Sequence, residues 1–289
     1  MSPASRSVTR VITPQPVVEG AGVRLGRSIG MSSLDYLDPF LLLDHFESRQ
    51  ASDYEAGFPY HPHRGIETVT LIRAGEVRHG DSLGHRGTIG AGDIQWMTSG
   101  SGVLHEEMPL VRAEGIAGLQ LWLNVPAREK MSRPTYRDLP GARLTETQTA
   151  EGARIRVIAG EAAGRLAGPV EGLAVAPKFV DVTLAAGAAF RETVPPGHTA
   201  FAYVDRGEVS FGPEKTVARA AALVVFGDGE VVEARAGAVG GRFLLAAARP
   251  LGEPAARYGP FVMNTRAEIE QALEDLRTGR FIRDEPREA

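Results

Sequence analysis

Short stretches of alternating apolar and polar residues, each ended by glycine or proline, recur along this chain and restrict the folds open to it. Side chains two apart on a β-strand point to the same face, so such alternation is typical of strands with one buried face. Examples are residues 66–72, 94–97, 119–125, 155–159 and 178–184. The 34 glycines and 19 prolines are spread between these stretches, where a many-stranded fold needs turns. The pattern predicts an all-β protein built as sandwiches or barrels.

The length of 289 residues suffices for two domains, and the texture of the sequence changes near its middle. Residues 126–149 are polar and contain proline, as is typical of a connection between domains. We therefore expect an N-terminal domain over residues 1–140 and a C-terminal domain over residues 141–289. Residues 70–77 resemble residues 202–209, which suggests a duplicated β-unit.

One helix is predicted close to the C-terminus. Thr265 and Glu268 have the spacing of a capping box, in which each side chain bonds the backbone N–H of the other residue. Apolar residues follow at helical spacing, namely Ile269, Ala272, Leu273 and Leu276. Gly279 is a suitable residue to end the helix. We expect this helix to end the C-terminal domain and to pack its apolar stripe on one of the β-domains.

The composition argues against several classes of protein. Cysteine is absent, so disulfides and thiolate zinc sites are excluded, and His, Asp and Glu are the remaining metal donors. The formal net charge of −4 provides no basic surface for neutralising phosphates, so direct nucleic-acid binding is not expected. The first residues lack the apolar core of a signal peptide, and no apolar run reaches the length of a membrane span. We expect a soluble, cytoplasmic protein.

Two motifs carry metal-binding chemistry. His61 and His63 form a His-x-His pair, and His105 and Glu107 form a His-x-Glu pair, each within a segment that reads as a strand. Because residues two apart on a strand share a face, each pair presents both donors on one side. Two such strands, paired in a sheet, could place four ligands around one ion. On an unbroken strand Glu67 would face the same way as His63, so strand geometry alone leaves Glu67 and Glu107 as alternative carboxylate ligands.

The other four histidines are interpreted as surface or satisfied core residues. His79 and His85 flank a turn, and His45 stands alone in its strand. His198 is the only histidine of the second half, which therefore cannot build a multi-histidine site by itself.

Several blocks of the sequence resemble the pirin family. The spacing His-x-His-x-x-x-Glu has the shape of the first cupin motif. The blocks that carry the closer resemblance are HPHRGIETVT, GDIQWMTSGSGVLHEEMP, GLQLWLN, LDPFLLLDHF and GPFVMNT. The resemblance implies a bicupin: two cupin-type β-barrel or jelly-roll domains with a short C-terminal helix. It also implies that the metal site lies in the N-terminal domain and that the C-terminal cupin domain lacks one.

Carried onto this sequence, the resemblance implies that the metal ligands are His61, His63, His105 and Glu107. Glu67 then lies outside the ligand set, as a supporting or pocket residue. Such a site of nitrogen and oxygen donors with open positions suits Fe(II), and also Mn, Co, Ni, Cu or Zn.

The resemblance further implies an activity. Members of the family oxidise flavonols such as quercetin with O₂, opening the heterocycle and releasing carbon monoxide, and Glu107 would then be both a ligand and the catalytic base. The alternative is a non-enzymatic, iron-dependent redox sensor that binds a protein partner. A third possibility is a metal that only stabilises the barrel. Packing of two similar domains in one chain also makes a monomer the expected state.

Overall fold

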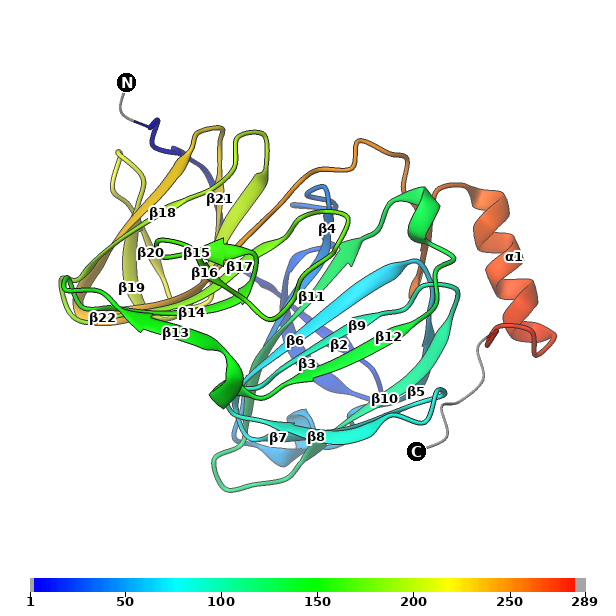
Figure 1. Ribbon diagram of the computed structural model, residues 1–289. Helices are drawn as coiled ribbons and strands as arrows, with labels where there is room; N and C mark the ends of the chain where they lie inside the picture. Colours follow the sequence, from blue (N-terminus) through cyan, green and yellow to red (C-terminus); the bar gives the residue numbers. More distant parts are fainter. Residues whose placement is uncertain (1–2, 284–289) are drawn as a thin grey trace. The chain divides into compact units, whose positions relative to one another are not determined.

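The computed structural model describes residues 3–283, and by their contacts these divide into two compact units (Figure 1). The first, here called the histidine unit, contains residues 15–142 and 251–283. The second unit contains residues 3–14 and 143–250. The chain therefore enters each unit twice.

The histidine unit contains two antiparallel sheets. The larger one has the order β12 (Thr135–Leu139), β9 (Ile94–Thr98), β6 (Ile66–Ala74), β11 (Ile116–Asn124), β4 (Phe40–Ser48), β3 (Val23–Ile29) and β2 (Gln15–Glu19). The smaller one has the order β5 (Phe58–His63), β10 (Val103–Leu110), β7 (Glu76–Asp81) and β8 (Arg86–Gly90). A hairpin of β23 (Ala256–Tyr258) and β24 (Phe261–Met263) follows late in the chain. Single 3₁₀ turns lie at Ala51–Asp53, Ala127–Glu129 and Gly141–Arg143.

The second unit contains one large antiparallel sheet and a short hairpin. Its main order is β1 (Val8–Ile12), β21 (Ala222–Phe226), β19 (Thr199–Phe211), β22 (Val231–Ala248), β17 (Lys178–Leu184), β14 (Ala153–Ala159) and β13 (Thr145–Gln148). Pairing outside this order adds β18 (Ala189–Thr193) and β20 (Thr216–Arg219), and the hairpin is β15 (Glu161–Ala162) with β16 (Leu166–Ala167). Small and branched apolar side chains fill the core, with Phe190, Phe211 and Phe243 in edge-to-face contact.

The all-β prediction is confirmed, but the polar middle segment is not a simple connection. Residues 135–139 form β12, which pairs with β9 in the histidine unit. Residues 145–148 form β13, which pairs with β14 in the second unit. Backbone N–H and C=O groups can pair into a strand whatever the side chains are. Because these two segments are polar, the alternation of apolar and polar residues did not predict either strand.

The similarity between residues 70–77 and residues 202–209 corresponds to similar bends in the backbone. Gly75 and Gly207 both have positive φ, of 76° and 74°. A β-carbon at either position would collide with a carbonyl oxygen, that of Gly115 or of Gly240 respectively. Glycine is required at both bends because no larger residue tolerates the conformation and the close approach together.

The single α-helix among residues 3–283 is α1 (Arg266–Arg277), which has the predicted capping box at Thr265. Its stripe differs from the prediction at one position: Leu276 is exposed, while Asp275 is buried. Asp275 accepts a hydrogen bond of 2.8 Å from the buried guanidinium of Arg64, so this polar position belongs to the buried face of the helix. By its contacts the helix belongs to the histidine unit, and not to the unit that contains residues 143–250. Within the described part of the chain, no helix has the length and apolar character needed to cross a membrane.

Candidate metal centre

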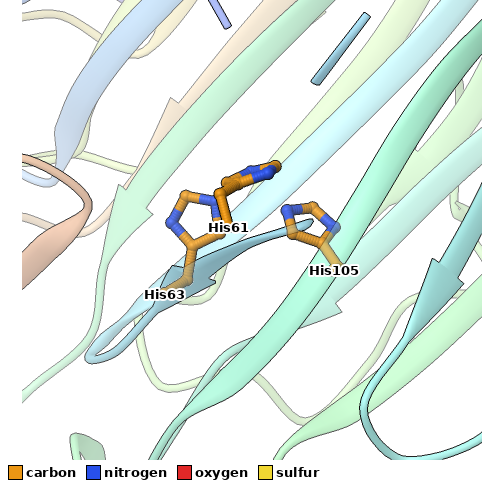
Figure 2. A group of neighbouring side chains, drawn as sticks. All are labelled: His61, His63 and His105. Carbon is orange, nitrogen blue, oxygen red and sulfur yellow. The ribbon is translucent and has the colours of Figure 1, made fainter. Parts of the chain in front are cut away.

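Three histidines converge at the pairing of β5 and β10. The two strands are antiparallel, with His105 directly opposite His61, and His63 shares the face of His61. One nitrogen from each ring lies within 4.8 Å of the other two, and the ring centroids are 4.4–5.0 Å apart. Figure 2 shows the three rings gathered together. The predicted pairing of a His-x-His strand with a His-x-Glu strand is therefore present.

The environment of these rings fits a metal ion. His105 is completely buried, and neither of its ring nitrogens has a hydrogen-bond partner among residues 3–283. Burying such a group without a partner costs about 1–3 kcal/mol, so a native protein rarely leaves it so. His61 and His63 each direct Nδ1 at a backbone carbonyl, Pro59 at 2.9 Å and Pro260 at 3.4 Å. A partner of this kind on one ring nitrogen commonly orients a histidine that binds metal through the other.

The protonation of the buried rings also favours a metal. Burial lowers the pKa of His63 and of His105 well below the usual range, and the neighbouring imidazoles add to the effect. Both rings are therefore neutral at pH 7. Because a metal ion needs the lone pair that a proton would occupy, neutral rings bind it without first losing protons.

Glu107 lies in the same cavity but outside the histidine group. Its carboxylate accepts hydrogen bonds from Gln120 Nε2, at 2.9 and 3.2 Å, and from Thr70 Oγ1 at 3.2 Å. Among the described residues, the donor atoms within 4.8 Å of one another come from the three histidines alone. The structure thus gathers three of the four predicted ligands and holds the fourth beside them with an amide and a hydroxyl.

Glu67 occupies a different environment from the one that strand parity suggested. The strand is not continuous: β5 ends at His63, and β6 begins at Ile66 after Gly65, whose φ is 78°. Glu67 is buried on β6, where it accepts hydrogen bonds from Trp96 Nε1 at 3.2 Å and Thr98 Oγ1 at 3.1 Å. It does not line the cavity beside the histidines. The geometry therefore favours Glu107 over Glu67 as the carboxylate at the site.

The buried carboxyl of Glu67 should leave a pH signature in stability. Burial raises its pKa from 4.5 to about 7, against the opposing hydrogen bonds from Trp96 and Thr98. The folded state then binds this proton more tightly than the unfolded chain, so the stabilisation is complete below pH 4.5 and is lost as the pH rises to about 7. Relative to Glu67→Gln, the unfolding free energy of the metal-free wild type should fall by about 3 kcal/mol across this window. Denaturant unfolding near pH 4.5 and pH 7.5 measures the difference, and parallel pH dependences in the two proteins would contradict it.

The residue after His63 anchors the turn that follows the motif. The Arg64 guanidinium is buried and donates to Ser101 O at 2.6 Å and to the Asp275 carboxylate at 2.8 Å. It also lies over the Phe281 ring, 4.5 Å from the centroid. Because the Arg64 guanidinium is held by these several contacts, it fixes the backbone next to His63.

A buried lysine holds the next carbonyl of the same turn. Lys130 Nζ donates to Gly65 O at 2.9 Å, Val262 O at 2.8 Å and Asn124 Oδ1 at 2.6 Å. Burial lowers the pKa of Lys130 to about 8, so at pH 7 the three oxygens still surround a cation. Together Arg64 and Lys130 tie the turn after His63 to β24 and α1.

A cavity of about 660 Å³ opens beside the histidines, which is within the usual size range of small-molecule sites. His61, His63 and Glu107 all line it. Among the residues of its wall that were not predicted are Gln120, Trp122, Arg27, Asp44, Arg257 and Pro260. Gln120 and Trp122 had a signal, because residues two apart on the strand 119–125 share a face. Arg257 had none, because it comes from a hairpin some 150 residues after the second motif.

The remaining first-half histidines each lie beside a carboxylate, which agrees with their interpretation as ordinary residues. His79 Nε2 lies 2.9 Å from the Asp138 carboxylate, and His85 Nδ1 lies 2.7 Å from that of Asp81. Both rings stack on Tyr136.

Comparisons with known proteins agree with this architecture. The family model described as Pirin matches residues 22–123, and that described as Pirin C-terminal cupin domain matches residues 179–282. A pirin-like protein of Caulobacter vibrioides is 43% identical over 96% of this chain and 99% of its own length.

Solved structures agree as well. A quercetin 2,3-dioxygenase from Acinetobacter baumannii matches with a TM-score of 0.86 at 33% identity, covering 96% of this chain and 99% of its own. The bacterial pirin YhhW of Escherichia coli, solved in complex with nickel(II), has the same fold with a TM-score of 0.64 at 18% identity, covering 83% of this chain and 98% of its own.

The two family models fall on the two halves of the sequence, and the relatives span nearly all of it. The prediction of two cupin domains with a short C-terminal helix is therefore confirmed. With its histidine cluster in the half that the first model matches, this chain is a member of the pirin family.

Proposed function

We propose that this protein is a metal-dependent dioxygenase that opens the heterocycle of a flavonol such as quercetin. The metal is bound by His61, His63 and His105, with Glu107 as the fourth ligand, and the working ion is Fe(II). The observation that carries the proposal is the buried, unpartnered ring of His105 beside two oriented imidazoles at the wall of a ligand-sized cavity. The similar protein from Acinetobacter baumannii is named for this activity.

The bound ion supplies Lewis acidity, which lowers the pKa of a chelating hydroxyl, and a redox centre for O₂ chemistry. The chain supplies the base. Glu107 takes the proton of the flavonol 3-hydroxyl, while Gln120 and Thr70 keep its carboxylate in place. General-base catalysis of this kind contributes about 10²–10⁴-fold to a rate.

The reaction balances without a further reductant. One flavonol and one O₂ give one carboxylic ester and one carbon monoxide, with both oxygen atoms entering the organic product and two C–C bonds of the central ring broken. The cavity must admit a flat molecule with an ionised oxygen at its edge. The Trp122 indole, in edge contact with His63 at 5.0 Å, offers an aromatic wall for it.

Oxygen uptake tests the proposal. Protein loaded with Fe(II) is expected to consume O₂ and release CO in equal amounts when given quercetin, and protein loaded with zinc is expected to do neither. Zinc is the matched control because it accepts the same donors but does not cycle between oxidation states. Iron-loaded protein that consumes no O₂ with any of a panel of flavonols would contradict the proposal.

The regulatory alternative separates in the same experiment. An iron-dependent sensor would bind iron and respond to its oxidation without consuming a flavonol, and a purely structural ion would be replaced by zinc without effect. A protein partner, a monomeric state, a cytoplasmic location and a second unit without metal stay predictions.

A further inference from the structure

Two arginines line the cavity beside the histidines, and they differ in how their charges are balanced. Arg27 makes a two-pronged ion pair with Asp44, at 2.7 and 2.8 Å, and its remaining Nη1 lies 2.8 Å from the Glu19 carboxylate. Its charge and its donors are therefore used within the protein.

Arg257 has no such partner among the residues that the structure describes. Its one hydrogen bond among residues 3–283 runs from Nη1 to the carbonyl oxygen of Leu41, at 3.3 Å, and no carboxylate of these residues lies within 4.0 Å of its guanidinium. Partial burial lowers its pKa, and Arg27 lowers it further, while the more distant Asp35, Asp44 and Glu19 act in the opposite direction. Since Asp44 and Glu19 are already paired with Arg27, Arg257 keeps donors free for a ligand.

The position of Arg257 relates it to the metal centre. Its guanidinium lies over the Trp122 ring, 5.3 Å from the centroid, and the edge of the same indole contacts His63 at 5.0 Å. One aromatic ring thus separates the cation from a metal ligand. The hairpin that carries Arg257 also provides the carbonyl oxygen of Pro260, which faces His63 Nδ1. The same short segment therefore positions the Arg257 guanidinium and helps to orient the His63 ring.

We propose that Arg257 determines specificity by binding an anionic group of the substrate, a carboxylate or an ionised phenol, at the end opposite to the oxygens that chelate the metal. The preferred ligands are then flat aromatic chelators with a second negative charge. Guanidinium groups suit this task because they bind carboxylate or phenolate oxygens with two parallel donors. The inference rests on the proposed metal site but not on turnover.

Binding to protein loaded with zinc, in the absence of turnover, tests the inference. The probes are 3,4-dihydroxybenzoate and its neutral amide, 3,4-dihydroxybenzamide, which chelate through the same two hydroxyls. Wild type is expected to bind the carboxylate about tenfold more tightly than the amide, as for a hydrogen-bonded charge pair. Arg257→Gln should bring the two affinities together, and Arg257→Lys should retain part of the difference.

Arg24→Gln is the matched control, because Arg24 is exposed, pairs with Asp53 at 3.4 Å and does not line the cavity. It should leave the preference unchanged, and zinc content should equal that of wild type in every variant. Equal affinities in wild type, or a preference that survives Arg257→Gln, would overturn the inference. If the protein prefers the carboxylate probe but its iron form takes up no O₂ with flavonols, only the dioxygenase proposal is refuted. If the iron form takes up O₂ but the protein does not prefer the carboxylate probe, only the role of Arg257 is refuted.

Discussion

Replacement of His105 by leucine is expected to stabilise the metal-free protein and at the same time abolish metal binding. Both ring nitrogens of His105 are buried without partners in the described part of the chain, so an apolar side chain of similar size removes a desolvation cost of about 1–3 kcal/mol. The same change removes one of three converging donors. Denaturant unfolding of the metal-free proteins and the metal content of the loaded ones measure the two effects.

The two opposite effects distinguish a ligand from an ordinary buried histidine. The matched control is His79→Leu, since His79 is equally buried but bonds Asp138 and stacks on Tyr136. That variant should lose stability and keep its metal. A His105→Leu protein that is destabilised without metal, yet still binds the ion, would show that His105 is a core residue.

Glu107→Gln is expected to keep the metal and lose turnover of the flavonol by about 10²–10⁴-fold. An amide presents the same shape but cannot take a proton, and the three imidazoles that hold the ion remain. The control is Glu106→Gln, the adjacent carboxylate, which points to the other face of β10 and should change neither property. Metal content and initial rates of O₂ uptake measure the outcome.

The result also decides between the two roles given to Glu107. Unchanged turnover would contradict its role as the base. Loss of the ion from Glu107→Gln would mean that coordination by Glu107 is essential to the site, and that the hydrogen bonds from Gln120 and Thr70 serve metal binding before catalysis.

Strand parity predicted the histidine cluster because the relevant rule is local. His61 and His63 needed only an extended backbone to share a face, and His105 needed only one antiparallel partner. Parity failed for Glu67 because Gly65, with its positive φ, interrupts the strand. After such a break the side chains no longer keep the alternation of the preceding strand. The register of β10 against β5 also shifts between His105 and Glu107, which no alternation in the sequence indicates.

The parts that could not be predicted depend on contacts between distant segments. β1 pairs with β21, more than 200 residues away, while the hairpin of β23 and β24 and the helix α1 belong by contacts to the histidine unit. The predicted division near residue 140 assigns every residue by its order in the chain. The division by contacts differs from it at both ends of the chain, because residues 3–14 join the second unit and residues 251–283 join the histidine unit. Pairing of this kind depends on which edges and faces remain uncovered after folding, and the order of elements does not encode it.

The most direct test of the metal site is the position of a bound ion. Crystals of the metal-loaded protein, with anomalous scattering recorded at the absorption edge of the metal, show where it lies. A single ion per chain, about 2.0–2.2 Å from one nitrogen of each of His61, His63 and His105, is the predicted result. An ion bound elsewhere, or three imidazoles with no ion between them at saturating metal, would contradict it.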